Sequence, residues 1–339
     1  MTQLTPPPTR ARSPLERLPV EIIQTIFLHC LEFNLPRASF ELSQKLSDPV
    51  LYSWLIRLAF SSANESASQR FFSPEFLPPP LHFYALSKPA RRDLQNAILN
   101  CRWCTLPLMR KCQRDYVAHA IRHQCQHLDF SPNDQHTLRN LGSYFLRPAD
   151  HHCDCGVKGR RGKGDLVLRA RAHHTDEECR VAIWFHFGAF QMRRPSRIYT
   201  EHDLFRLPSC AVDTPARMPD KLLRPPWTAT RLEFLQLLSM DAYIDEDTSH
   251  ARSRRVLRQT IRDREFEAFR HLLGLYIRSR EYKYPVLWPV STNHFHVALK
   301  YADPGGGADP FVRLLVEQRW GTVPGGDVVL KERLLARVG

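Results

Sequence analysis

The chain of 339 residues is rich in potential metal ligands, with nine cysteines and sixteen histidines. The most regular group is Cys101-x2-Cys104-x14-His119-x3-His123, whose spacing is typical of a zinc site. Proteins build tetrahedral zinc sites from thiolate and imidazole groups. However, both cysteines also continue an apolar helical pattern, and cysteine is often buried without any metal. We therefore expect buried thiols and no cofactor, with a zinc site as the alternative.

A second group of potential ligands, HHCDC at residues 151–155, is followed at a distance by His173, His174 and Cys179. Its spacing matches no ligand frame, so a polar loop is the better interpretation. The catalytic motifs G-x-S-x-G and H-E-x-x-H are missing, and so is a glycine-rich phosphate loop. We expect no enzymatic activity.

An acidic run follows a predicted helix in the C-terminal third of the chain. It consists of Asp241, Asp245, Glu246 and Asp247. We interpret this run as a solvated loop and not as a pair of catalytic carboxylates, because runs of like charge usually lie in solvent.

Lysine and arginine outnumber the acidic residues by 48 to 35, which gives a net charge of +13. The densest basic run, KGRRGK at residues 158–163, lies in a glycine-rich stretch without aromatic residues. A solvated loop explains this run better than a nucleic-acid interface does. Nucleic acid is therefore not an expected partner.

The composition also predicts the compartment. No apolar run approaches the roughly 18 residues that a membrane span needs. Residues 1–12 are polar and proline-rich, so we expect a disordered tail and not a signal peptide. Cysteines without such a signal are typical of reduced thiols in the cytoplasm or nucleus.

Any functional site must be positioned by the helices and strands of the fold. The first of these are expected in a helical unit at residues 13–60. After Pro19, apolar residues at helical spacing form two neighbouring strips. One strip consists of Ile22, Ile26 and Cys30, and the other of Ile23, Phe27 and Leu31. Together the strips are wider than the apolar face of roughly 100° that packing against one core needs. This helix is therefore expected to contact its own domain and a second protein.

Three start signals divide this unit into helices. Ser13 and Glu16 have capping-box spacing, Ser39 is placed to cap a short second helix, and Asp48-Pro49 opens a third. Helices this short bury too little surface to be stable alone.

The unit resembles the F-box family over about forty residues. The matching residues are Leu18-Pro19, Glu21, Ile22, Ile26-Phe27, Asn34-Leu35 and Leu51-Tyr52. The bend NLPRAS followed by LSQKLSD looks like the form found in many fungal F-box proteins, although the common Val-Cys-x-x-Trp of the second helix is missing.

This resemblance implies docking to a Skp-type adaptor and, through it, to a cullin–RING ubiquitin ligase. Each buried Leu, Ile or Phe side chain contributes roughly 1.5–3 kcal/mol, so several together exceed an association cost of roughly 4–15 kcal/mol. Sequence alone leaves open which strip faces the adaptor. The expected contact residues are Leu18, Pro19, Ile22, Ile26, Phe27, Leu31, Leu35 and Pro36.

The middle of the chain is predicted to contain three segments. Residues 61–86 form a linker whose Phe71, Phe72, Phe76 and Leu77 pack back onto the body. Residues 87–150 are helical, and residues 151–227 are β-rich and irregular. Within the last segment, alternating apolar residues predict paired strands in DLVLRARAH (165–173) and VAIWFHFGAF (181–190), with RIYT (197–200) as a third.

The C-terminal residues 228–339 contain a repeat. The pattern F-x-x-L-L begins at Phe234, Phe269 and Phe311, and the stretch 293–298 is similar to the opening of an ankyrin repeat. Stacked helix pairs of ankyrin-like type are therefore predicted.

These observations predict a mainly α fold, with a three-helix F-box, a helical middle segment, a small β-rich insert and C-terminal stacked helix pairs. The expected function is that of a substrate receptor, which docks an adaptor and presents an unidentified protein for ubiquitination. Two alternatives remain, a zinc-containing nucleic-acid-binding protein and a helical-repeat scaffold that acts without a ligase.

Overall fold

The computed structural model describes residues 13–62, 64, 70–146, 165–193, 204–282, 284–303 and 307–338. Helices make up 52% of the described residues and strands 12%, in a five-stranded and a three-stranded sheet. The prediction of a mainly α fold with a small β-rich insert is therefore wrong, and the chain is a mixed α and β protein. The predicted tail 1–12 lies outside the described residues.

The N-terminal unit begins with a short 3-10 helix, Leu15–Arg17, in which Ser13 and Glu16 form the expected reciprocal capping box. Ser39 accepts a hydrogen bond from the Leu42 amide, and Asp48 accepts one from the Val50 amide at 2.8 Å, so the two other predicted caps are also confirmed. The helices of the unit are α1 (Val20–Cys30), α2 (Leu35–Ala38), α3 (Phe40–Lys45) and α4 (Pro49–Phe60).

The helix α4 joins this unit to the rest of the molecule, because it packs against both α5 and α6. The following helices are α5 (Lys88–Asn100), α6 (Leu106–Gln124), α7 (Pro132–Arg139) and α8 (Leu141–Leu146). The segment before α5 is not a free linker. Phe71, Phe76 and Leu77 are buried and Phe72 is half-buried, as predicted.

The five-stranded sheet is antiparallel and its strands follow in chain order. They are β1 (Leu128–Phe130), β2 (Leu166–Ala172), β3 (Glu178–Trp184), β4 (Ala189–Arg193) and β5 (Leu204–Arg206). The predicted pairing of the two alternating stretches is confirmed, since β2 pairs with β3 and Leu168 lies opposite Val181. The second stretch consists of two strands, β3 and β4. The predicted strand RIYT lies outside the described residues.

A glycine makes the turn between β3 and β4 possible. Gly188 has a φ of 57°, a conformation that favours glycine, and its carbonyl accepts a hydrogen bond from Leu207 at 3.1 Å. A Cβ at this position would collide with the Leu207 carbonyl and with Gln113 of α6. The turn therefore holds the sheet closely against α6.

The C-terminal part begins after a 3-10 helix at Asp220–Leu222, and its helices pack in series. Helix α10 contacts α11 and α12, and α12 contacts α13 and α14. The three F-x-x-L-L patterns lie on α9, α11 and α13 with their phenylalanines buried. The elements are α9 (Ala229–Leu238), β6 (Tyr243–Asp245), α10 (Ala251–Arg262), α11 (Phe266–Leu273), β7 (Tyr276–Ser279), β8 (Val286–Leu287), α12 (Thr292–Tyr301), α13 (Pro310–Arg319) and α14 (Val328–Leu335).

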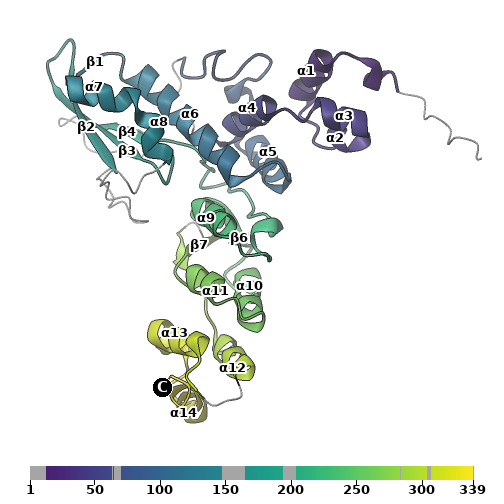
Figure 1. Cartoon of the computed structure of the whole chain (residues 1–339), viewed down its shortest axis with the longest axis vertical. Coiled ribbons are helices and arrows are strands. Elements are labelled where there is room, and N and C mark those ends of the chain that lie inside the picture. The colour runs from purple at the N-terminus through teal and green to yellow at the C-terminus, as the bar shows by residue number, and fades with distance from the viewer. Residues whose placement is uncertain are drawn as a thin grey trace, which may run out of the picture.

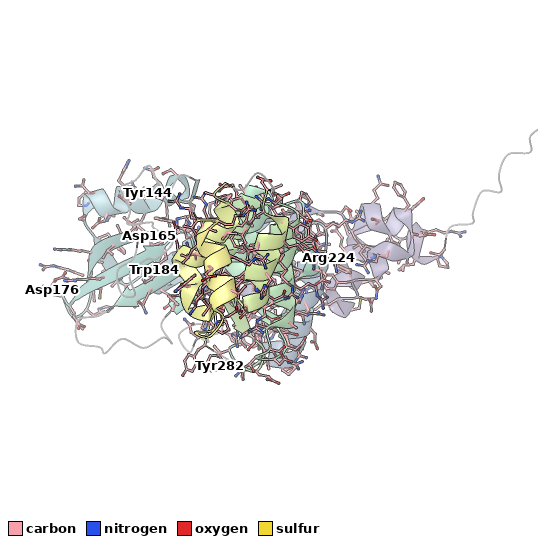
Figure 2. All side chains as sticks on the ribbon, turned by 90° about the horizontal axis from the view of Figure 1, so that it is seen from below. Tyr144, Asp165, Asp176, Trp184, Arg224 and Tyr282 are labelled. Carbon is pink, nitrogen blue, oxygen red and sulfur yellow. The ribbon has the colours of Figure 1, made fainter. Side chains whose placement is uncertain are left out.

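The strands β6, β7 and β8 form the second sheet, which the sequence did not predict. They are only two to four residues long, too short for an alternating pattern to show. This part is therefore not made of helix pairs alone. Figure 1 shows it extending from the middle of the molecule, with the helices α1–α3 and the five-stranded sheet on opposite sides. Figure 2 gives the same arrangement from below, with Asp176 and Trp184 on the sheet side.

The predicted solvated acidic loop is wrong for two of its four residues. Asp241 and Asp245 are buried at 9% and 3% exposure, because each has a specific partner. Asp241 forms an ion pair with Arg206 of β5, and Asp245 accepts hydrogen bonds from the Arg252 and Ser253 amides at the start of α10. None of the helices in the described ranges is both long and apolar enough to cross a lipid bilayer.

Candidate functional site

The first helix, α1, has one buried strip and one exposed strip. Ile23 and Phe27 are 0% and 2% exposed, whereas Ile22 and Ile26 are 47% and 37% exposed. Cys30 continues the exposed strip by one more turn. The structure thus settles what the sequence left open, because the strip of Ile22, Ile26 and Cys30 is the one that faces outward.

Helix α3 fixes the orientation of α1. The Lys45 ammonium donates hydrogen bonds to the Glu16 and Leu18 carbonyls at 2.8 and 2.7 Å, and the Gln24 amide donates to the Lys45 carbonyl at 3.2 Å. The two bonds from Lys45 satisfy backbone carbonyls just before α1, and the bond from Gln24 satisfies the carbonyl of the last residue of α3. The Phe27 ring packs edge-on against Phe33 with the centroids 5.7 Å apart, which holds the buried strip inward. Ile22 and Ile26 must therefore stay in solvent.

The eight predicted contact residues do not all lie on the surface. Phe27 is part of the internal packing, so including it among the contact residues was wrong. Pro19, Ile22 and Ile26 are exposed, and Leu18, Leu31, Leu35 and Pro36 are half-buried. Three exposed apolar residues of this unit were missed, namely Val20 at 37%, Phe40 at 82% and Val50 at 48%. Phe40 directly follows the cap residue Ser39, and Val50 lies two residues after the cap residue Asp48. Both side chains therefore lie at the outer end of their helices.

A cleft of about 700 Å³ lies where the N-terminal unit meets the turn between α5 and α6. Phe33 and Pro36 line it from one side and Trp103 from the other. The Tyr52 and Trp103 rings stack with their centroids 4.2 Å apart, so the unit is fixed to the body through an aromatic contact.

The four residues of the alternative zinc set are not brought together. Cys101 and Cys104 precede α6, while His119 and His123 lie near its other end. From its first residue, Leu106, to His119 the helix α6 rises about 20 Å at 1.5 Å per residue. Because α6 is a single unbroken helix, the four side chains cannot reach one metal ion. The described parts of the chain contain no group of three or more His, Cys, Asp or Glu that could hold one.

The thiols and imidazoles of this set have packing roles. Burial raises the pKa of the Cys104 thiol to about 12 and that of Cys112 to about 11, so both stay protonated at neutral pH. His119 stacks on Phe76 at 4.4 Å and meets the Phe71 carbonyl through Nε2. The interpretation of the cysteines as buried thiols is confirmed for Cys104. The second predicted group, residues 151–155, lies outside the described residues.

Burial lowers the pKa of His119 to about 4, against about 6.5 in an unfolded chain. Between these two values only the unfolded chain binds the proton, so stability must fall as the pH falls through this window. From pH 7 to pH 5 we expect the His119 proton to cost about 2 kcal/mol of unfolding free energy, since one pKa unit corresponds to about 1.4 kcal/mol.

Urea unfolding of the wild type and of His119→Gln at both pH values checks this expectation. Burial also lowers the pKa of His271 and His294. Both residues are present in the wild type and in the variant, so their effects on the unfolding free energy cancel in the comparison. Equal losses in the two proteins would show that His119 does not titrate in this window.

No protein-family model, curated protein or solved structure matches the chain. The resemblance to the F-box and the similarity of residues 293–298 to an ankyrin opening therefore stay predictions from the residues themselves.

Proposed function

We propose that residues 13–60 dock a Skp-type adaptor, and that the rest of the chain presents a substrate protein to the attached cullin–RING ubiquitin ligase. The observation that carries this proposal is the exposed strip on α1. Ile22 and Ile26 are 47% and 37% exposed, so the rest of the chain leaves part of both side chains uncovered. The same two residues are among those that match the F-box pattern.

The energetics of the strip suit an interface. Isolated exposed apolar residues are common on protein surfaces, but several on one small unit mark an interaction site. Full burial of an isoleucine is worth roughly 1.5–3 kcal/mol. Ile22 and Ile26 would form the centre of the contact, with Pro19 beside them at the start of the helix. The half-buried Leu31, Leu35 and Pro36 would lie at its border.

The chain itself would perform no chemistry. A receptor of this kind acts by holding substrate lysines near the ligase, which raises their effective concentration. Such a role places the chain in the cytoplasm or nucleus, where the ligase components and reduced thiols are found. No observation on the described residues favours the zinc-containing alternative.

The double variant Ile22→Asp/Ile26→Asp tests the proposal. Two carboxylates in the middle of an apolar interface would have to be buried unpaired, so we expect a loss of adaptor affinity of at least a hundredfold. The measurement is copurification of the adaptor with the full chain, followed by titration of purified adaptor. Folding should be unaffected because both side chains are already in solvent.

A matched control is Val329→Asp on α14, which also places a charge at an exposed apolar position, 67% exposed. It should keep full adaptor binding. If the double variant binds the adaptor as well as the wild type does, the proposal fails, and a scaffold that acts without a ligase becomes the better reading.

A further inference from the structure

The helix α10 carries five arginines and no acidic residue among its twelve residues. Arg254, Arg255, Arg258 and Arg262 lie within an arc of about 100° of the helix, at 100° per residue. We call these four residues the arginine stripe. The rest of the circumference of the helix includes the buried residues Val256, Leu257 and Ile261. Packing of the helix requires only that its outer face be polar. It does not require that all charged residues on that face have the same sign.

The stripe has no carboxylate partner among the described residues. Burial, and after it the charges of Arg262, Arg255 and Arg254, lower the pKa of Arg258. The Arg254 Nε atom is buried and has no hydrogen-bond partner. Helices usually relieve such repulsion with acidic residues one turn away. The described part of the chain supplies no such ion pair to the stripe, so its charge is free to meet an acidic group of another molecule.

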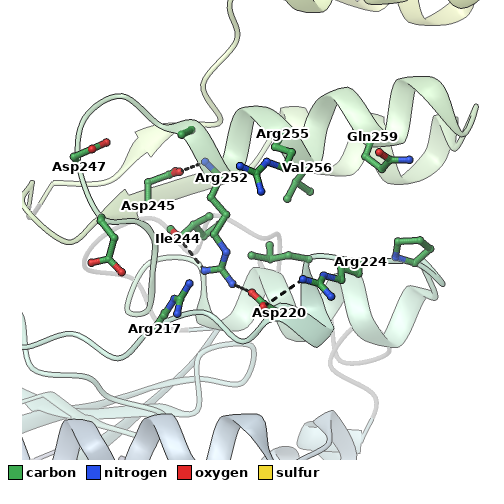
Figure 3. A pocket seen from close by; sticks show the side chains of 14 residues that line it. Arg217, Asp220, Arg224, Ile244, Asp245, Asp247, Arg252, Arg255, Val256 and Gln259 are labelled. Carbon is green, nitrogen blue, oxygen red and sulfur yellow. Dashed lines mark hydrogen bonds and ion pairs between the residues drawn. The ribbon is translucent and has the colours of Figure 1, made fainter.

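One residue of the stripe, Arg255, lines a cleft of about 820 Å³, drawn in Figure 3, and the other three lie beside it on the same helix. Arg255 and Gln259 of α10 line this cleft, and Arg217 and Arg224 line it from the opposite side. Leu223, Pro225, Ile244 and Val256 add an apolar surface. The cleft therefore offers cationic groups beside a place for an apolar side chain.

The cleft also contains carboxylates, but each is already engaged. Asp220 pairs with Arg252 and Arg224, and Asp245 accepts the amides at the start of α10. Glu246 pairs with Arg280 at 3.2 Å, and Asp247 accepts from Ser249 at 2.5 Å.

The guanidinium groups of Arg217 and Arg255, by contrast, make no ion pair within the described part of the chain, so the unused charge of the cleft is positive. Their side chains are exposed to solvent.

We propose that the arginine stripe and this cleft bind a segment of a substrate protein that is rich in Asp and Glu and carries one apolar anchor. Arg255 and Arg262 are about 10 Å apart along the helix, which an extended peptide spans in about three residues. Nucleic acid fits less well, because the cleft lining has no aromatic side chain on which a base would stack. By calling the bound segment part of a substrate, this proposal rests on the receptor function proposed above.

The probe for the test is a fluorescein-labelled peptide of twelve residues with five glutamates and one leucine, measured by anisotropy with the full chain. We expect saturable binding that weakens with added salt, and no binding of the same peptide with glutamine in place of glutamate. The variant Arg255→Glu/Arg262→Glu should bind at least tenfold more weakly, because like charges would then face each other.

The matched control is Arg139→Glu/Arg169→Glu, which changes the net charge equally at two exposed residues outside the stripe. It should bind the peptide like the wild type. Equal binding by the stripe variant and the wild type would overturn the proposal. Tighter binding of a twelve-nucleotide oligo-dT, or binding only of a peptide with phosphoserine in place of glutamate, would also overturn it.

Adaptor binding separates this inference from the proposed function. The stripe variant should copurify with the adaptor as the wild type does. The variant Ile22→Asp/Ile26→Asp should keep its affinity for the peptide. A failure of either proposal is therefore seen without the other.

Discussion

Replacing Phe71 by alanine is expected to lower the free energy of unfolding by about 3–5 kcal/mol, the cost of removing a fully buried aromatic ring. Phe71 is 0% exposed and contacts rings from three separate parts of the chain. Its centroid lies 5.7 Å from Tyr116 of α6, 5.2 Å from Phe205 of β5 and 4.9 Å from its neighbour Phe72. No single neighbour can move in to fill the cavity without leaving the other two.

Urea unfolding of the full chain measures this loss, and Phe40→Ala is the control. Phe40 is 82% exposed, so its removal should change stability by no more than about 0.5 kcal/mol. Phe71→Leu should fall between the two, because it retains most of the buried volume. A loss below about 1 kcal/mol for Phe71→Ala would mean that the segment 70–86 is loosely attached in solution.

The parts of the fold that the sequence predicted are those with strong local signals. Ser13, Ser39 and Asp48 start their helices as expected, because a cap is decided by a few neighbouring residues. The pairing of β2 with β3 followed from two long alternating stretches. The strands β1, β5 and β6–β8 have only two to four residues, and their pairing depends on distant segments that no local pattern reveals.

The candidate site also was predictable only where the signal is local. The two apolar strips on α1 were visible as a pattern, but only the packing of Phe27 against Phe33 decides which strip is buried. The Cys and His spacing did not produce a zinc site, because such a site needs a turn that brings the cysteine pair back to the histidine pair. Instead, α6 continues without a break from residue 106 to residue 124. The arginine stripe was not recognised as a site, because five arginines in the twelve residues of α10 are unremarkable until the helix places four of them on one face.

Removing the Asp241 carboxylate is expected to cost about 3–5 kcal/mol of unfolding free energy, because it leaves buried positive charge unpaired. Asp241 lies between Arg206 of β5 and Arg278 of β7, and both guanidinium groups have an Nε atom that is buried without a partner. Arg278 also donates to the Val212 carbonyl at 2.8 Å. This cluster therefore connects the five-stranded sheet with the C-terminal helices.

Urea unfolding of Asp241→Ala measures the loss, and Glu246→Ala is its control, because the exposed pair of Glu246 with Arg280 contributes no more than about 1 kcal/mol. The double variant Asp241→Ala/Arg206→Met should recover part of the loss, since it also removes one of the unpaired charges. Equal losses for the single and double variants would show that the damage is a cavity and not an uncompensated charge. The receptor function proposed above requires a fixed relation between the adaptor surface and the substrate surface, and the Asp241 cluster is one of the contacts between the two parts of the chain. We therefore expect hydrogen exchange in α10 to rise in Asp241→Ala while α1 keeps its protection.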